Sequence, residues 1–247
     1  MDTILKLFKD PYERKARAYP GLLVILPVLV PIVSVHGAEN PVLTAIAGLV
    51  FGCGAIYAVA SVARGRGKAL EEKLIAKWGG MPTTIALRHR DNFLDSVSKR
   101  RYHDAIREKL GIAIPTPEEE TEDTVKADDI YVGATRRLRE LTRNNKELLL
   151  EENIAYGFHR NMVAMKPVGI VICFIGIAYG MLISPVVQAT PPYFNLELIT
   201  TPGLAAGLTL AISVTLLLSW ILYFNKAAVK RIGFSYAERL FECLESL

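Results

Sequence analysis

The hydrophobic positions of this chain gather in two long blocks that are separated by polar sequence. The blocks cover residues 18–63 and 167–224, and the only charged residues inside them are Glu39 and Glu197. Each glutamate lies in a short polar gap that divides its block in two. A membrane-spanning helix needs about 20 predominantly apolar residues, and a charge at its centre costs roughly 2.5 to 3.5 kcal/mol. The pattern therefore predicts four transmembrane helices arranged as two hairpins, at residues 21–35, 41–63, 167–187 and 203–224.

The Lys and Arg residues all lie outside the two hydrophobic blocks, and their distribution predicts how the chain is oriented in the membrane. Of the 29 Lys and Arg residues, 5 precede Tyr19, 20 lie in residues 64–166 and 4 follow Phe224. The gaps around Glu39 and Glu197 contain neither Lys nor Arg. Because Lys and Arg accumulate on the cytoplasmic side of membrane proteins, we expect both termini and the middle segment to be cytoplasmic.

The fold predicted from these patterns is all-α, with a helical domain inserted between two membrane hairpins. In the middle segment, Gly111 ends a helix predicted over residues 96–110. Thr116 and Glu119 have the spacing of a capping box, and a last soluble helix is predicted over residues 128–143. We expect five parts: an interfacial segment (1–19), hairpin 1 (20–63), a cytoplasmic helical domain (64–166), hairpin 2 (167–224) and a cytoplasmic C-terminal helix (225–247).

Small and hydroxyl residues recur at four-residue spacing within the predicted spans. Pairs of glycines let helix backbones approach closely in lipid, and they predict close packing within the chain or self-association at Gly48 and Gly52, Gly176 and Gly180, and Gly203 and Gly207. The last span also carries hydroxyls that either line a polar pore wall or bond to helix carbonyls and neighbouring helices. These hydroxyls belong to Thr209, Ser213, Thr215 and Ser219.

Residues for catalysis or metal binding do not form a recognisable pattern. His89, His103 and His159 occur without the HExxH motif or a nearby cysteine. The three cysteines of the chain show no CxxC spacing. We therefore expect no enzyme activity, no metal and no cofactor. The predicted spans also lack Asp, Glu, Lys, Arg and His in their interiors, whereas ion-coupled carriers usually need such residues near the bilayer midplane.

Arginine clusters are the strongest chemical signal in the middle segment. Guanidinium groups with aromatic neighbours suit phosphates and stacked bases. One cluster lies opposite the apolar face formed by Ile130, Tyr131, Ala134, Leu138 and Leu141 in the last soluble helix. The candidate ligand-binding residues are Arg88, Arg90, Lys99, Arg100, Arg101, Arg136, Arg139 and Arg143. The alternative is that these residues form solvated faces paired with the acidic run at 118–123, or contact lipid headgroups.

Three sequence blocks resemble those of bacterial four-span proteins found on mobile genetic elements. The blocks are residues 9–16, residues 78–84 with 87–91, and residues 156–161 with 165–167. The resemblance implies a membrane effector of an anti-phage defence system, located in the bacterial inner membrane. It also implies a partner enzyme that makes a nucleotide-type signal. None of these properties follows from the spacing of the residues themselves.

The leading functional hypothesis is a homo-oligomeric channel or pore-forming effector gated by a cytosolic nucleotide or single-stranded oligonucleotide. One alternative is a membrane-anchored scaffold that recruits a soluble partner and conducts nothing. Another is a membrane enzyme acting on lipid, whose histidines would have to reach the headgroup layer.

Overall fold

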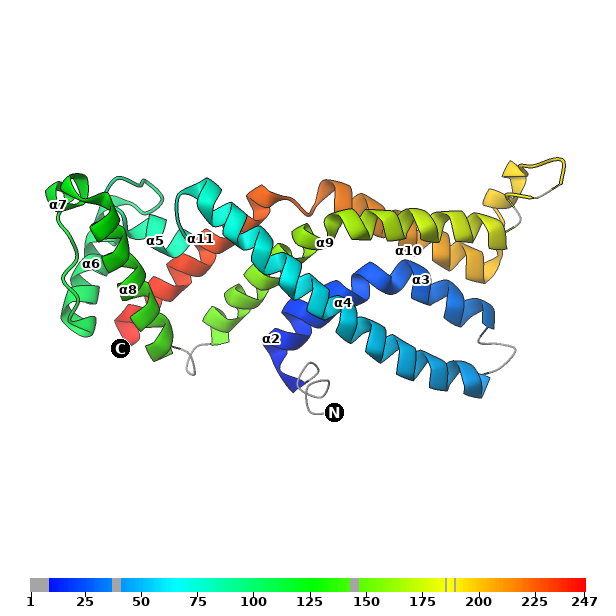
Figure 1. The fold of residues 1–247 in the computed structure, drawn as a ribbon, viewed down its shortest axis with the longest axis horizontal. Coiled ribbons are helices and arrows are strands. Elements are labelled where there is room, and N and C mark those ends of the chain that lie inside the picture. Colours follow the sequence, from blue (N-terminus) through cyan, green and yellow to red (C-terminus); the bar gives the residue numbers. More distant parts are fainter. Residues whose placement is uncertain (1–8, 37–40, 143–146, 185, 189) are drawn as a thin grey trace. The chain divides into compact units, whose positions relative to one another are not determined.

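In the computed structural model of the chain, the regular elements of the described residues are all helices, joined by loops (Figure 1). The described residues are 9–36, 41–142, 147–184, 186–188 and 190–247. Within those ranges, the side chains of residues 36, 43, 44, 46, 47, 49–53, 147, 148, 198 and 199 are not described. The only extended pairing in this part of the chain is an isolated bridge between Val187 and Phe194. The all-α prediction is confirmed.

The chain folds into two units that divide the sequence differently from the predicted domains. Residues 1–70 and 157–225 form one unit, called here the apolar unit. Residues 71–156 and 226–247 form the other, called here the charged unit. The C-terminal segment therefore belongs with the middle of the chain. Helix α4 (Pro41–Trp78) begins in the apolar unit and ends in the charged unit, and α9 (Glu147–Ile183) runs in the opposite sense.

The apolar unit contains segments long and apolar enough to cross a membrane. They are Pro11–Val35, Leu149–Ile183 and Gly203–Leu222, and the second begins in the charged unit. The first comprises α2 (Pro11–Glu13), the π-helix η1 (Arg14–Ala18) and most of α3 (Tyr19–His36); the last is α10 (Gly203–Leu222). Three of the predicted spans thus have the required helices, as expected of a multi-pass membrane protein. The predicted span at 41–63 is helical within α4, but many of its side chains lie outside the described residues.

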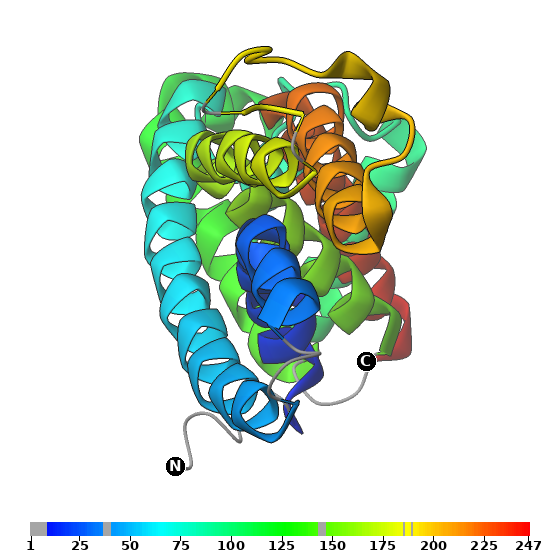
Figure 2. The same cartoon turned by 90° about the vertical axis from the view of Figure 1, so that its right-hand side faces the viewer.

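Close helix packing in the apolar unit depends on glycines. A Cβ atom at Gly176 would lie 2.4 Å from Oγ of Ser213 and 2.8 Å from Cβ of Pro27, and one at Gly180 would lie 2.9 Å from Leu210. The glycines of α9 thus allow contact with both α10 and α3, and α3 also lies beside α10 (Figure 2). Pro27 is one of two prolines inside α3, which remains one helix from Tyr19 to His36.

The other predicted glycine pairs have different surroundings. A Cβ added at Gly48 would meet no described atom within 4 Å, and the surroundings of Gly52 lie outside the described residues. Gly203 opens α10 with a φ of +74°, a conformation that favours glycine. A Cβ at Gly207 would meet only Pro202, at 3.5 Å. Among the described residues, Gly48, Gly203 and Gly207 therefore make no tight contact with another helix.

The charged unit is built around a core of short helices and the C-terminal helix. Its remaining elements are α5 (Pro82–Leu87), α6 (Ser96–Leu110), α7 (Pro117–Glu122), α8 (Thr124–Thr142), α11 (Lys226–Glu242) and the 3₁₀ turn η3 (Cys243–Ser246). Leu87 of α5, Ile106 of α6, Leu138 of α8 and Phe241 of α11 are each at most 1% exposed and share one core. Helix α11 therefore completes the hydrophobic core of this unit.

Local capping fixes the helix boundaries in the charged unit. Helix α6 covers residues 96–110 as predicted and ends at Gly111, whose φ is +66°. The capping box of Thr116 and Glu119 is present at the start of α7. Helix α8 begins at Thr124, earlier than predicted, because the Asp123 side chain accepts a hydrogen bond from the backbone N–H of Lys126 at 2.9 Å.

Candidate functional site

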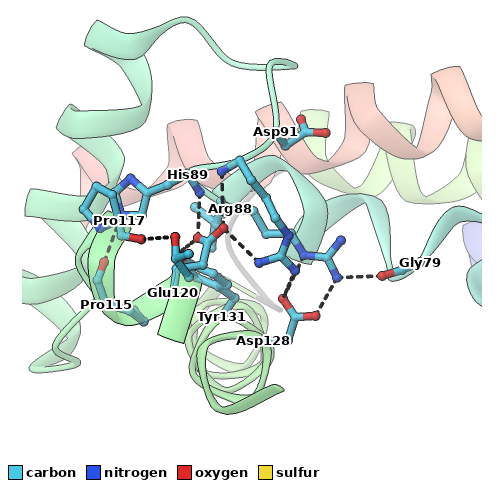
Figure 3. Close-up of polar contacts among 12 residues, drawn as sticks. Gly79, Arg88, His89, Asp91, Pro115, Pro117, Glu120, Asp128 and Tyr131 are labelled. Atoms are coloured by element: carbon cyan, nitrogen blue, oxygen red, sulfur yellow. Dashed lines mark hydrogen bonds and ion pairs between the residues drawn. The ribbon is translucent and has the colours of Figure 1, made fainter. Parts of the chain in front are cut away.

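A buried carboxylate, Glu120, is the centre of the polar contacts in the charged unit (Figure 3). The residue is 2% exposed. One of its oxygens accepts hydrogen bonds from the Tyr131 hydroxyl at 2.6 Å and the His89 backbone N–H at 2.7 Å. The other accepts from the Arg90 backbone N–H at 3.2 Å and from Nη1 of Arg90 at 2.9 Å. Four donors therefore satisfy this carboxylate.

The neighbouring Arg88 guanidinium ties the same segment to α8. Its Nε and Nη2 donate to the two oxygens of Asp128, at 2.8 and 2.6 Å, and Nη2 also donates to the Gly79 carbonyl at 2.6 Å (Figure 3). Arg90 adds a bond to Asp128 at 3.2 Å. Paired bonds between a guanidinium and a carboxylate fix geometry as well as adding energy. This network therefore sets the path of the chain between α5 and α6.

The electrostatics of the network keep Glu120 charged and Tyr131 neutral. Burial pushes the pKa of Glu120 upward, but the hydrogen bonds from Tyr131, His89 and Arg90 outweigh it, and the pKa lies below its ordinary value. Burial and the contact with Glu120 raise the pKa of Tyr131. The ion pair joins Arg90 to an acid of the 118–123 run, but Glu120 is buried and does not belong to a solvated face.

Several predicted ligand-binding residues use their donors inside the protein. Lys99 is 8% exposed, and its Nζ donates to the backbone carbonyls of Arg88, at 2.8 Å, and Asp91. Arg101 pairs with Glu245 at 3.3 Å and lies over the ring of the adjacent Tyr102. Lys99 and Arg88, which is also 8% exposed, contribute to the fold rather than to an open ligand site. Arg100 differs, because it is exposed and lines a pocket beside α6.

Arg136 and Arg139 lie together at a pocket between α8, α9 and α11, called here the α8 pocket. Its volume is about 420 Å³. The lining residues are Arg136, Arg139, Glu140 and Thr142 of α8, Leu149, Leu150 and Asn153 of α9, and Tyr236 of α11. Arg143 lies outside the described residues. The structure thus brings together two of the three arginines predicted for this helix.

Both arginines of the α8 pocket retain donors for a ligand. Arg136 has no hydrogen bond or ion pair among the described residues, and Arg139 uses only Nε, which donates to the Thr135 carbonyl at 3.3 Å. Glu140 supplies one opposing charge and pairs with Arg137 at 3.5 Å. The pocket therefore presents an excess of positive charge, as an anionic ligand requires.

The buried face of α8 differs from the predicted apolar face at several positions, because Ala127, Thr135 and Thr142 are buried and Ile130 is only half-buried. Tyr131, Ala134 and Leu138 are buried as expected, but Leu141 is 38% exposed. Thr142 is buried in its place because its hydroxyl donates to the Leu138 carbonyl at 2.8 Å, which satisfies its polar atom. The prediction that Leu141 belongs to the core face was wrong.

The hydroxyls of α10 divide between two faces of the helix. Thr209 and Ser213 are both fully buried inside the apolar unit. Thr209 donates to the Ala205 carbonyl at 2.8 Å, and Ser219 donates to the Thr215 carbonyl at 2.8 Å. Thr215 is exposed on the surface of the unit. Bonding to helix carbonyls, the alternative to a pore wall, therefore describes Thr209 and Ser219.

Sequence reasoning missed several residues of these sites. Arg107 lies seven residues after Arg100 and therefore on the same face of α6, a periodicity that could have revealed it. Asn153 and Tyr236 reach the α8 pocket from distant parts of the sequence, which only the tertiary fold brings together. The sequence marks Asp128 only as the start of a helix, although this carboxylate accepts bonds from two arginines.

The residues that the structure describes contain no group of three or more His, Cys, Asp or Glu side chains able to hold a metal ion. Comparison with protein-family models, curated proteins and solved structures finds no match. The arrangement of the residues themselves is therefore the basis for a functional proposal.

Proposed function

We propose that this chain is a four-span protein of the bacterial inner membrane that assembles into a homo-oligomeric channel, opened by an anionic ligand on the cytosolic side. Three described helices have the length and composition of spans. The fourth span would be residues 41–63 of α4, a stretch without a charged residue. Two hairpins would place both termini and the charged unit on the same side, where the Lys and Arg residues lie.

The observation that carries the proposal is the position of the α8 pocket on α9. Leu149, Leu150 and Asn153 of the first turns of α9 line the pocket opposite Arg136 and Arg139. The same helix continues without interruption to Ile183, through the third span. A ligand held by the two arginines would therefore contact the helix that crosses the membrane, so its binding energy could favour one position of that span over another.

The ligand class follows from the arginines of the α8 pocket. Guanidinium groups bind phosphates through paired hydrogen bonds, and Arg136 and Arg139 are exposed with donors to spare. A nucleotide or a single-stranded oligonucleotide supplies such phosphates. In an oligomer, each arginine would repeat around the symmetry axis and favour a polyanion. The resemblance to defence effectors adds a partner enzyme that makes the signal.

A channel suits the spans better than an ion-coupled carrier does. The described spans pack through Gly176, Gly180 and Trp220, and their residues 21–35, 167–183 and 203–222 contain no Asp, Glu, Lys, Arg or His. Coupled carriers usually keep such residues at the midplane. Thr215, which is exposed on α10, is the hydroxyl best placed to face a neighbouring subunit or an aqueous path.

Ion flux into vesicles that contain the purified chain tests the proposal. Hexathymidylate and inorganic triphosphate serve as probe ligands. We expect flux after addition of a probe to the native chain, and its loss in the double variant Arg136→Gln, Arg139→Gln. Arg137→Gln is the matched control, because Arg137 is on the same helix but does not line the pocket.

Salt provides a second readout of the same site. Binding of a polyanion through arginines releases counterions, so the affinity for hexathymidylate should fall steeply as salt rises. The double variant should show a shallower dependence than Arg137→Gln. Flux that persists unchanged in the double variant would contradict gating through the α8 pocket.

A non-conducting scaffold is the second candidate function. The observation that favours it is the burial of Thr209 and Ser213 inside a single chain, which removes both hydroxyls from any aqueous path between chains. A scaffold would recruit a soluble partner through the charged unit. It would give no flux with any ligand while still binding the anionic probe.

A further inference from the structure

The charged unit contains another pocket, called here the α6 pocket, that the proposed channel mechanism does not use. Its volume is about 490 Å³, within the range of about 300 to 1,000 Å³ that small-molecule sites occupy. Its walls come from residues 89–94, from α6 and from residues 114–117. The pocket shares no lining residue with the α8 pocket.

Two arginines supply the exposed positive charge of the α6 pocket, whereas Lys99, which also lines it, is buried. Arg100 and Arg107 are two turns apart on α6, line the pocket and are exposed. Neither has a hydrogen bond or ion pair among the described residues. Asp104 contributes one opposing charge between them. The two guanidinium groups are therefore free to bind a phosphate carried by a ligand.

Two histidines give the same pocket hydrogen-bond acceptors. Nε2 of His103 lies 2.8 Å from the Leu87 carbonyl, and Nε2 of His89 lies 2.9 Å from the Pro115 carbonyl. A carbonyl only accepts, so each Nε2 carries a hydrogen, and in the neutral form of either ring the lone pair is on Nδ1. Burial lowers the pKa of His103 to about 4, which keeps that ring neutral at neutral pH. Neither Nδ1 is hydrogen-bonded within the described part of the chain.

Apolar side chains form another part of the α6 pocket wall, beside the polar residues Asn92, Ser96 and Thr116. Leu94, Ile114, Pro115 and Pro117 all line it. The rings of His89 and His103 meet edge to face with centroids 4.8 Å apart. Apolar side chains next to a few oriented polar groups are typical of sites that bind small organic molecules. The pocket thus combines a wall for a ring, acceptors for its substituents and cations for an anion.

We propose that the α6 pocket binds a phosphate-bearing molecule whose aromatic ring carries an exocyclic amine, the chemistry of an aminated nucleoside monophosphate. Arg100 and Arg107 bind the phosphate. The Nδ1 atoms of His89 and His103 accept hydrogen bonds from the amine. This binding requires neither a pore nor any residue of the α8 pocket, so it is independent of the proposed channel function.

The experiment measures binding of AMP to the full chain in lipid nanodiscs by calorimetry. We expect saturable binding of AMP and about tenfold weaker binding of IMP, because IMP lacks the amine and forfeits a hydrogen bond. Inorganic phosphate alone should bind far more weakly than AMP. Equal affinities for AMP and IMP, or for AMP and phosphate, would overturn the proposal, as would the absence of saturable AMP binding.

Protein variants test the assigned residues. The double variant Arg100→Gln, Arg107→Gln should lose about tenfold or more in AMP affinity. Lys109→Gln removes an exposed charge from the same helix outside the pocket and should bind AMP normally. His89→Phe keeps an aromatic ring but removes the Nδ1 acceptor, so it should reduce the preference for AMP over IMP. An unchanged AMP affinity in the arginine variant would refute the site.

The outcomes separate this inference from the channel proposal. AMP binding that survives Arg136→Gln with Arg139→Gln, in a chain that shows no ion flux, would retain the α6 pocket and reject the channel. Ligand-gated flux without AMP binding would support the channel and reject the α6 pocket as an AMP site.

Discussion

The hydroxyl of Tyr131 donates to Glu120 across 2.6 Å, and both side chains are buried in the charged unit. Tyr131 comes from α8, and Glu120 from α7. The same carboxylate accepts the backbone N–H groups of His89 and Arg90. One buried charge therefore holds together α7, α8 and the segment that follows α5.

Removing this hydroxyl should destabilise the charged unit. Tyr131→Phe leaves the Glu120 carboxylate buried with one donor fewer, and hydrogen bonds to charged groups contribute about 1.5 to 3 kcal/mol. Hydrogen exchange of residues 124–142 in the detergent-solubilised chain measures the loss. Tyr102→Phe is the control, because the Tyr102 hydroxyl accepts only a 3.3 Å bond from the exposed Arg101. Equal losses in both variants would argue against the central role of Glu120.

The stability of the charged unit should fall in mildly acidic solution because of His103. Its pKa is about 4 in the folded chain and 6.5 ordinarily, so the unfolded chain binds more protons between these values. The free energy of unfolding should therefore decrease as the pH falls from 6.5 to about 4, by on the order of 3 kcal/mol in total. Above pH 6.5 this contribution does not change.

Thermal unfolding followed by circular dichroism measures this pH dependence. His103→Gln retains a donor for the Leu87 carbonyl but does not titrate, so it should flatten the curve in this pH window. Protonation of the Glu120 carboxylate destabilises the charged unit separately. Because the pKa of Glu120 is lowered in the folded chain, this loss of stability appears only as the pH falls below the ordinary pKa of 4.5. A variant curve parallel to that of the native chain would exclude His103 as the cause.

Gly169 should tolerate no side chain, because Trp220 packs directly on it. A Cβ at this position would lie 2.3 Å from Cε2 of the fully buried Trp220 ring. Gly169→Ala should therefore destabilise the apolar unit by roughly 1 to 3 kcal/mol through overpacking. Gly65→Ala, where the added atom meets nothing within 4 Å, should be neutral or stabilising. The thermal midpoint in detergent compares the two, and a stable Gly169→Ala would contradict the packing.

Lys166 should contribute to stability through the end of α10. Its Nζ donates to the carbonyls of Ile221 and Phe224, at 3.2 and 3.1 Å, where the helix leaves carbonyls without partners of their own. Lys166→Met should cost about 1 to 2 kcal/mol, measured by hydrogen exchange of residues 216–224. Lys68→Met changes an exposed lysine of α4 and should have little effect. Unchanged exchange in Lys166→Met would show that the cap is dispensable.

The local sequence was sufficient to predict the helices but not the buried polar contacts. Gly111 ends α6 and the capping box at Thr116 begins α7, as the sequence predicts, because such helix boundaries depend only on residues that are near one another in the sequence. Arg88 and Lys99 looked like free cations because their partners, Asp128 and backbone carbonyls, lie elsewhere in the fold. Charge in a sequence does not reveal burial, which is set by tertiary packing.

The sequence does predict that the two arginines of the α8 pocket lie side by side. Arg136 and Arg139 are three residues apart and therefore share a helix face. The opposite wall could not be predicted, since it joins the start of α9 to Tyr236 of α11. The same limit applies to the α6 pocket, in which His89 and Pro115 meet across the fold.

Membrane topology is the central claim, because gating by a cytosolic ligand requires the arginines to face the cytoplasm and the four spans to cross the membrane. In a chain without native cysteines, single cysteines replace Ala38, Glu122 and Asn195, and intact cells are treated with a thiol reagent that cannot cross the membrane. Two hairpins with a cytoplasmic charged unit predict labelling at positions 38 and 195 and none at 122 until the cells are opened. Labelling at 122 in intact cells, with protection of 38 and 195, would contradict the account.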